Sequence, residues 1–396
     1  MLDEGVALSA HRTAALEVAP GSRASAVGRL AYLDNLKTLL IAGIIAAHAV
    51  QGYATFGSWT YQDVQEVTLS PAVELVSMIL IISLGALFLM ALFFLISGLF
   101  TEDSLARKSS SRFVEDRLLR LGIPFAIYSL LLWPLLEYAL FGPFRHVGFW
   151  RSVGNTDPIL DNGPMWFVGV LLLFSLALVA WRAVFPRPAP TAEPLRGRML
   201  ILLALAVGVS TFLVRIVFPA DSNQPLNVKL WAWPEYIALF SLGVAAARRG
   251  WLRPVPNALA RRCGIATIVA ILCTATSIIT ASTFGLTEED YFGGWGVPAL
   301  LAAMTEGVVA VTGPIWILAF AQRHLDGTGR LRRAAARSSY LAFMLQGPVL
   351  VSLALLLRPI DLTGDVKALL VATLGIVGSF ALAWPIVSRT RLGRVL

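Results

Sequence analysis

The sequence predicts an all-α protein: a polytopic transmembrane helical bundle of about ten spans, with both termini in the cytosol. Hydrophobic residues make up 57% of the chain and charged residues only 14%. Apolar runs of about 20 residues recur along its length, each long enough to cross a bilayer. No soluble fold has use for so much apolar surface, so the composition excludes a string of soluble domains.

Ten apolar runs qualify as spans by length and hydropathy. The predicted spans are Leu36–Ala54, Glu74–Phe100, Leu121–Phe141, Pro164–Phe185, Met199–Phe218, Trp231–Ala247, Cys263–Phe284, Gly296–Ala321, Tyr340–Leu357 and Val366–Val387. The second is long for a single crossing and is expected to tilt or to project beyond the bilayer. The sixth is short for a crossing.

Lysine and arginine are distributed unevenly between the two sides. With the N-terminus in the cytosol and the spans alternating, all but six of the 32 basic residues fall on the inner side. This asymmetry predicts cytosolic termini and an even number of spans. It also accounts for the net charge of +8, so no nucleic-acid partner is expected. The six exceptions are Arg145, Arg151, Lys229, Arg358 and Lys367 outside and Arg215 within a span.

Three segments follow from this pattern: a disordered cytosolic tail at 1–29, a membrane domain at 30–388 and a basic cytosolic tail at 389–396. The first tail is polar and partly acidic, so it does not resemble a cleavable signal peptide. Cys263 and Cys273 lie about 15 Å apart along one predicted helix, too far for a disulfide. They fit no metal-ligand spacing, and no metal site is predicted.

The first span carries three ionisable side chains on one stripe. A helix turns about 100° per residue, so Lys37 and His48 return to within about 20° of each other, and Asp34 lies about 40° to the other side of His48. His48 lies about 16 Å beyond Lys37 along the axis. An ionisable side chain at that depth marks a functional site that faces protein or water. The plainer alternative is a histidine that hydrogen-bonds a neighbouring backbone carbonyl.

A basic segment follows the second span. Arg117 and Arg120 are three residues apart, so on a helix they point to one side and can bind one anion, and guanidinium groups suit phosphate. The plainer alternative is a positive anchor at the inner membrane surface. Ser97 and Gly98, near the end of the second span, permit the close approach of a thin ligand, although small residues also pack membrane helices together.

Two further features lie in or near the outer half of the bundle. Trp166 begins the fourth span from outside, where it either forms a wall of an acceptor site or marks the membrane interface. Glu306 and Arg215 lie within spans, and buried charges need partners. Glu306 is therefore expected to face the bundle interior, near Arg215 or near His48.

Five segments occur in the order seen in the acyltransferase-3 family, which the chain resembles from Leu30 to about Val387. They are YLDNLKTLLIAGIIAAHAV, FFLISGLF, SRFVEDRLLRLGIPF, GPMWFVGVLLLF and SSYLAFMLQGPVL. The family consists of integral membrane O-acyltransferases of bacteria, with relatives elsewhere, and includes a glucan-succinylating type. The resemblance identifies 30–388 as an acyltransferase-3-like membrane domain.

The resemblance implies that His48 is the catalytic base; we group the carboxylates of Asp34 and Glu306 with it as catalytic candidates. Lys37 stands where most members have arginine, and an ammonium group lacks the fork geometry of a guanidinium. Gln346 stands where many members have a histidine. An amide cannot shuttle a proton near neutral pH, so no second-histidine mechanism is expected.

The resemblance also divides the remaining candidates between the two substrates. The acyl-donor side receives Lys37, Arg117, Arg120, Ser97 and Gly98. The acceptor side receives Trp166 and Gln346.

The implied reaction moves an acyl group, as in O-acetylation or succinylation, from cytosolic acyl-CoA to a hydroxyl of a carbohydrate or other cell-envelope acceptor. Acyl-CoA is a co-substrate, and no bound cofactor is expected. Membrane lipids are the other expected partner, and the expected location is the bacterial inner membrane. Two alternatives stay open: a transporter or flippase for a polysaccharide or lipid-linked intermediate that uses His48, Glu306 and Arg215 as a path, and a structural partner of a biosynthetic complex.

Overall fold

The structure is a computed structural model, and it describes residues 31–57, 59–63, 67–82, 88–145, 161–185, 195–220, 222–252, 254–287, 289–390 and 393. All regular structure in these residues is helical. The α-helices are α2 Ala31–Gln51, α3 Pro71–Leu80, α4 Met90–Arg107, α5 Ser110–Arg117, α6 Ile123–Ile127, α7 Trp133–Arg145, α9 Trp166–Val184, α10 Gly197–Val217, α11 Trp233–Arg249, α12 Asn257–Ala281, α13 Glu289–Phe292, α14 Val297–His324, α15 Arg330–Leu357 and α16 Gly364–Arg389.

Nine helical stretches in the described residues are long and apolar enough to cross a membrane, which confirms the prediction of a polytopic helical bundle. The remaining predicted span, Glu74–Phe100, is described as α3 and α4 on either side of 83–87. The predicted tail at 1–29 lies outside the described residues, as does most of the tail at 389–396.

The third span is longer than predicted because α5, α6 and α7 join into one helix through two π-helical turns, η3 (Leu118–Gly122) and η4 (Tyr128–Leu132). Each turn ends two residues before a proline, Pro124 or Pro134, which lacks the N–H that an α-helical hydrogen bond needs. The N–H of Ile123 bonds to the carbonyl of Leu118, five residues back. The wider turn therefore keeps the helix continuous where an α-helical ladder would be interrupted.

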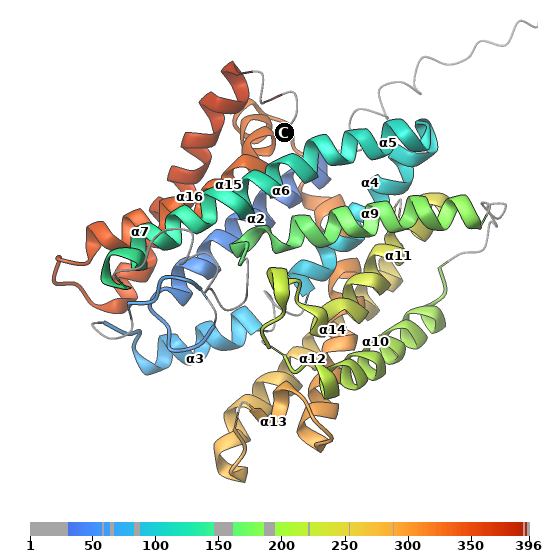
Figure 1. Cartoon of the computed structure of the whole chain (residues 1–396). Helices are drawn as coiled ribbons and strands as arrows, with labels where there is room; N and C mark the ends of the chain where they lie inside the picture. The colour runs from blue at the N-terminus through green and yellow to red at the C-terminus, as the bar shows by residue number, and fades with distance from the viewer. Residues whose placement is uncertain are drawn as a thin grey trace, which may run out of the picture.

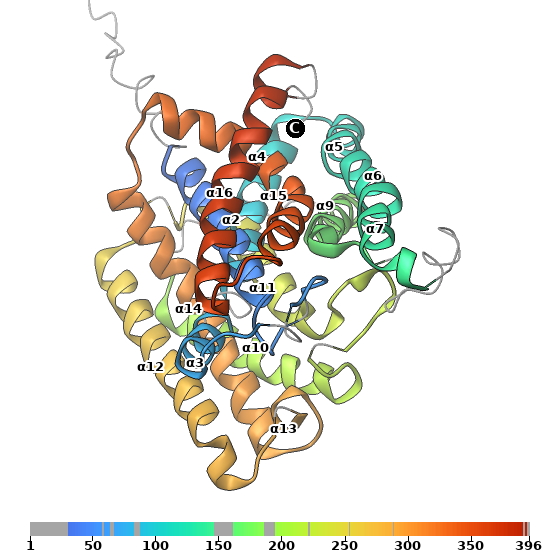
Figure 2. The same cartoon turned by 90° about the vertical axis from the view of Figure 1, so that its left-hand side faces the viewer.

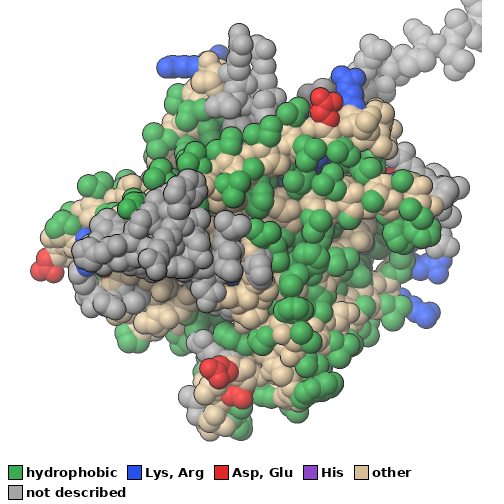
Figure 3. Space-filling view, in the orientation of Figure 1, with side chains coloured by type: hydrophobic (Ala, Val, Ile, Leu, Met, Phe, Trp, Pro, Cys, Tyr) green, Lys and Arg blue, Asp and Glu red, His purple; other side chains and the backbone are tan. Residues whose placement is uncertain are grey.

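Large apolar side chains cover the outside of the bundle. Leu130, Ile201 and Leu272 are 58%, 63% and 60% exposed. Hydrophobic side chains spread over the visible face in Figure 3, and many of the charged ones lie at its edges. A helix that is apolar on its outer side as well as its inner side suits a lipid environment. The apolar surface therefore agrees with the membrane location that the composition predicts.

Helix α2 lies inside the bundle, against α14, α15 and α16 (Figures 1 and 2). Its first half belongs to a core cluster shared with α4, α9, α11 and α14, through side chains such as Leu36 and Leu40. Its second half belongs to a second cluster shared with α15 and α16, through Ile44 and Ile45. Helix α2 thus connects two packed halves of the molecule.

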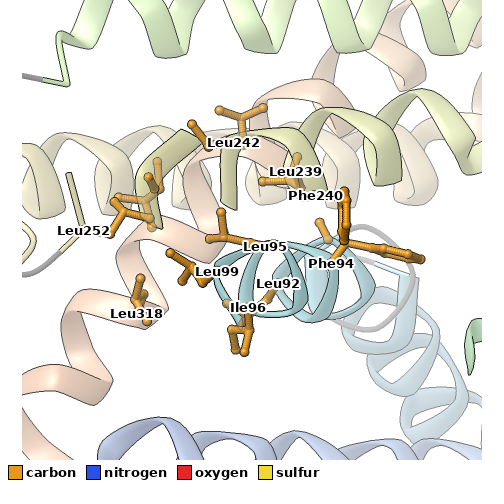
Figure 4. Packing of buried hydrophobic residues seen from close by; sticks show 14 of the residues in the cluster. Leu92, Phe94, Leu95, Ile96, Leu99, Leu239, Phe240, Leu242, Leu252 and Leu318 are labelled. Atoms are coloured by element: carbon orange, nitrogen blue, oxygen red, sulfur yellow. The ribbon is translucent and has the colours of Figure 1, made fainter. Parts of the chain in front are cut away.

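Helices α4 and α11 pack with their backbones nearly touching. A Cβ atom on Gly98 would lie 2.2 Å from the carbonyl oxygen of Phe240, and one on Gly243 would lie 2.2 Å from that of Leu95. Leu95 points toward α11 and Leu239 in Figure 4. Small residues that let two membrane helices approach in this way are typical of tight helix pairs. In the structure, Gly98 therefore lies at the contact between α4 and α11 and allows the two helices to pack closely.

Replacing Gly98 with alanine is expected to destabilise the protein, because the added methyl group must push α4 away from α11. Overpacking of this kind costs roughly 1–3 kcal/mol. Unfolding by SDS titration in mixed micelles would measure the loss. The matched control is Gly43→Ala, where the new methyl group meets nothing within 4 Å. Equal stability of the two variants would contradict the close contact.

Candidate active site

A cavity of about 560 Å³ runs along α2. The α2 side chains that line it recur every three or four residues and form the stripe predicted from helical periodicity, so that prediction is confirmed. Helices α4, α9, α11, α15 and α16 contribute other parts of the wall. The lining side chains of α2 are Asp34, Lys37, Ile41, Ile44, Ala47, His48 and Gln51.

One end of the cavity is basic. The ammonium group of Lys37 lies 4.1 Å from the centre of the Phe100 ring and 3.5 Å from a carboxylate oxygen of Asp34. Arg337 of α15 also lines the cavity, two residues from Ser339, whose hydroxyl lies 3.1 Å from that of Thr38, the residue after Lys37. Asp34 lies about 21 Å from His48 along the helix axis, so the structure does not bring these two groups together. We call this region the Lys37 end.

His48 lies near the other end and is bound through its Nδ1 atom. That atom is 3.0 Å from Oε1 of Gln346, and Nε2 of Gln346 donates to the carbonyl oxygen of Phe343 at 3.0 Å. Among the described residues, no hydrogen bond is recorded for Nε2 of His48, which leaves that nitrogen for a ligand in the cavity. Gln346 therefore contacts the imidazole of His48 directly.

The imidazole ring also stacks on an aromatic side chain from the segment after α2. The rings of His48 and Trp59 lie 4.4 Å apart at 15°. Trp59 meets Trp133 edge to face at 6.0 Å, and Trp133 donates its indole N–H to Asp161 at 3.1 Å. Trp133 fits between two glycines, Gly163 and Gly347, at which a Cβ atom would lie 2.5 Å and 2.9 Å from its ring. These contacts connect α7, the 161–163 segment and α15 to the histidine.

The segment that carries Trp59 is tied to neighbouring elements. The N–H of Leu69 donates to the carbonyl of Tyr53, and the N–H of Ser70 donates to the carboxylate of Asp365 at 2.9 Å. Tyr53 is buried, and this burial raises the pKa of its hydroxyl above the ordinary value, with Asp63 adding to the effect. The hydroxyl therefore stays neutral.

Aromatic side chains from α9, α11 and the segment before α11 line another part of the cavity. Trp166 stacks on Tyr236 of α11 with ring centres 5.8 Å apart. Both line the cavity together with Trp231 and Lys229. We call this region the Trp166 end.

Glu306 is paired with Arg215. Two guanidinium nitrogens lie 2.6 Å and 2.8 Å from its carboxylate oxygens, and both residues are buried. Glu235 is fully buried beside them, and Arg215 lies over the Trp231 ring at 5.1 Å. Of the two partners that the sequence suggested for Glu306, the structure selects Arg215. Glu306 does not line the cavity.

The residues assigned to the donor side from the family pattern are dispersed. Arg117 donates to the hydroxyl of Thr101 at 3.1 Å and lies over the Phe113 ring, whereas Arg120 is exposed. Neither arginine lines the cavity, nor do Ser97 and Gly98. Their binding of an acyl donor stays a prediction, and among the predicted donor residues only Lys37 lies at the cavity.

Sequence reasoning missed three contributors to the site. They are Arg337, Trp59 and Trp133, none of which is among the predicted site residues. For Arg337 a signal existed: it falls with Tyr340 and Phe343 at helical spacing on one cavity-lining face of α15. No local pattern pointed to Trp59 or Trp133.

No group of three or more His, Cys, Asp or Glu side chains that could hold a metal ion occurs in the part of the chain that the structure describes. Cys263 and Cys273 are free thiols, the first buried and the second exposed.

Comparison with protein-family models matches residues 30–388 to the acyltransferase-3 model, which is described as an acyltransferase domain. Comparisons with curated proteins and with solved structures found no match. The match takes in the whole cavity except Gly393.

Proposed function

Because the chain belongs to the acyltransferase-3 family and is a membrane acyltransferase, we propose that it moves an acyl group from cytosolic acyl-CoA to a hydroxyl of a cell-envelope acceptor. The observation that carries the proposal is the single cavity that contains both the basic Lys37 end and His48. In this proposal, one substrate enters from each end of the cavity and the two meet at the imidazole. The proposed location is the bacterial inner membrane.

The Lys37 end is the proposed donor entrance. Lys37 and Arg337 supply two positive charges for the phosphates of acyl-CoA. About 16 Å of helix separates Lys37 from His48. An extended pantetheine arm lying along α2, past Ile41 and Ile44, would carry the thioester toward the histidine.

The Trp166 end is the proposed acceptor entrance. Trp166, Tyr236 and Trp231 present aromatic faces, which suit the apolar faces of a sugar ring. A carbohydrate hydroxyl that enters here reaches His48 from the side opposite the donor.

In the proposed step, Nε2 of His48 acts as a general base. The acceptor oxygen attacks the thioester carbonyl, its proton passes to Nε2, and a new C–O bond forms. The C–S bond then breaks, and the leaving thiolate takes the proton from the imidazolium. The products are the acylated acceptor and free CoA, and His48 returns to its neutral state.

Inverted membrane vesicles from cells that produce the protein test the function. They would be supplied with radiolabelled acetyl-CoA or succinyl-CoA, and both released thiol and label bound to the envelope fraction would be measured. Label transfer and thiol release that depend on the protein are expected with at least one donor. Vesicles that release no thiol above the level of empty membranes with either donor would contradict the proposal.

Replacing both Lys37 and Arg337 with glutamine is expected to raise the KM for acyl-CoA about tenfold or more while kcat changes little, since two phosphate contacts are lost. The comparison variant is Arg117→Gln with Arg120→Gln. A larger KM increase in the comparison variant would move the donor site to the arginines of α5 and η3.

A further inference from the structure

We propose that Gln346 and Trp59 are positioning residues that hold His48 in the tautomer with its proton on Nδ1. This inference rests on the proposed function, because it concerns how the same imidazole is prepared to act as a base. Neither residue touches the reacting atoms in this scheme. Each acts through the ring of His48.

The orientation of the Gln346 amide follows from its second partner. A backbone carbonyl can only accept a hydrogen bond, so the Gln346 nitrogen must face the carbonyl of Phe343 at 3.0 Å. The amide oxygen then faces His48 Nδ1 at 3.0 Å. An amide oxygen can only accept, so Nδ1 must carry the proton. The hydrogen-bond network therefore leaves the lone pair on Nε2, where the general base needs it.

Helix α15 holds this amide rigidly. Gln346 is fully buried, and the next residue is Gly347, whose missing side chain lets α15 approach Trp133 and Tyr128. Because the Phe343 carbonyl lies on the same helix, one turn before Gln346, the amide cannot rotate without losing a buried hydrogen bond.

Trp59 fixes the plane of the ring. It lies parallel to the imidazole at 4.4 Å and is itself buried against Trp133. When His48 takes a proton it becomes a cation that faces an indole ring, an arrangement that stabilises the charge. Gln346 and Trp59 together do for this histidine what a carboxylate does in many catalytic dyads: they orient it and stabilise its charged form, without adding a negative charge to the membrane interior.

The test compares four variants in the vesicle assay. Gln346→Met keeps the length of the side chain but offers no oxygen, and Gln346→Glu keeps the acceptor oxygen. Trp59→Leu removes the stacking ring, and Trp59→Phe keeps one. We expect kcat to fall about 100-fold in Gln346→Met and less than about tenfold in Gln346→Glu, with the KM for acyl-CoA unchanged in both. Trp59→Leu should lose more kcat than Trp59→Phe.

The controls separate this inference from the proposed function. If the wild-type protein transfers no acyl group, the proposed function fails. If the wild type is active and Gln346→Met keeps its kcat, or if Gln346→Glu loses as much as Gln346→Met, the inference fails alone. Elution of each detergent-solubilised variant as a monodisperse peak shows that the fold is intact. If a variant aggregates in part but its folded fraction keeps the wild-type kcat, the residue stabilises the fold and does not position His48.

Discussion

His48→Ala is expected to abolish acyl transfer while the protein still inserts into the membrane. General-base catalysis contributes about 10²–10⁴ in rate, and in this cavity the part of the chain that the structure describes brings no second imidazole to the site. The loss should appear in kcat, with little change in the KM for acyl-CoA, because Lys37 and Arg337 lie at the other end of the cavity.

The matched control is His324→Ala. His324 is exposed at the end of α14, where its ring stacks on Phe320 and its Nδ1 lies 3.0 Å from the Phe320 carbonyl. This variant should keep wild-type activity. Full activity in His48→Ala would remove the general base from the mechanism.

Arg215→Met is expected to be the most destabilising single substitution considered for this protein. It leaves Glu306 buried beside Glu235 without its guanidinium partner. Breaking a buried ion pair by removing one member costs about 3–5 kcal/mol, since the remaining charge keeps its desolvation penalty. SDS titration in mixed micelles measures the loss directly.

Two comparison variants test whether the lost ion pair causes the loss of stability. Arg215→Met combined with Glu306→Gln removes both charges and should recover part of the stability. Lys108→Met breaks the half-exposed ion pair between Lys108 and Asp116 and should leave the unfolding midpoint unchanged. If Arg215→Met unfolds at the same SDS concentration as the wild type, the buried pair does not stabilise the bundle.

Much of the fold could be predicted from local patterns. Apolar runs, the lysine and arginine distribution and helical periodicity identified the membrane class, and they placed Lys37 and His48 on one stripe. The boundaries were less predictable: α15 begins at Arg330, ten residues before the predicted start at Tyr340, because a helix continues through polar residues that no hydropathy window includes.

The sequence by itself determined that this protein is a helical membrane bundle and that one face of its first span carries an imidazole and an ammonium group. Only the tertiary structure decided that Gln346 bonds His48, that Trp59 stacks on it, and that Glu306 pairs with Arg215. The reason is that periodicity describes one helix at a time. The His48–Gln346 contact joins residues 298 positions apart, so it depends on how α2 and α15 pack against each other.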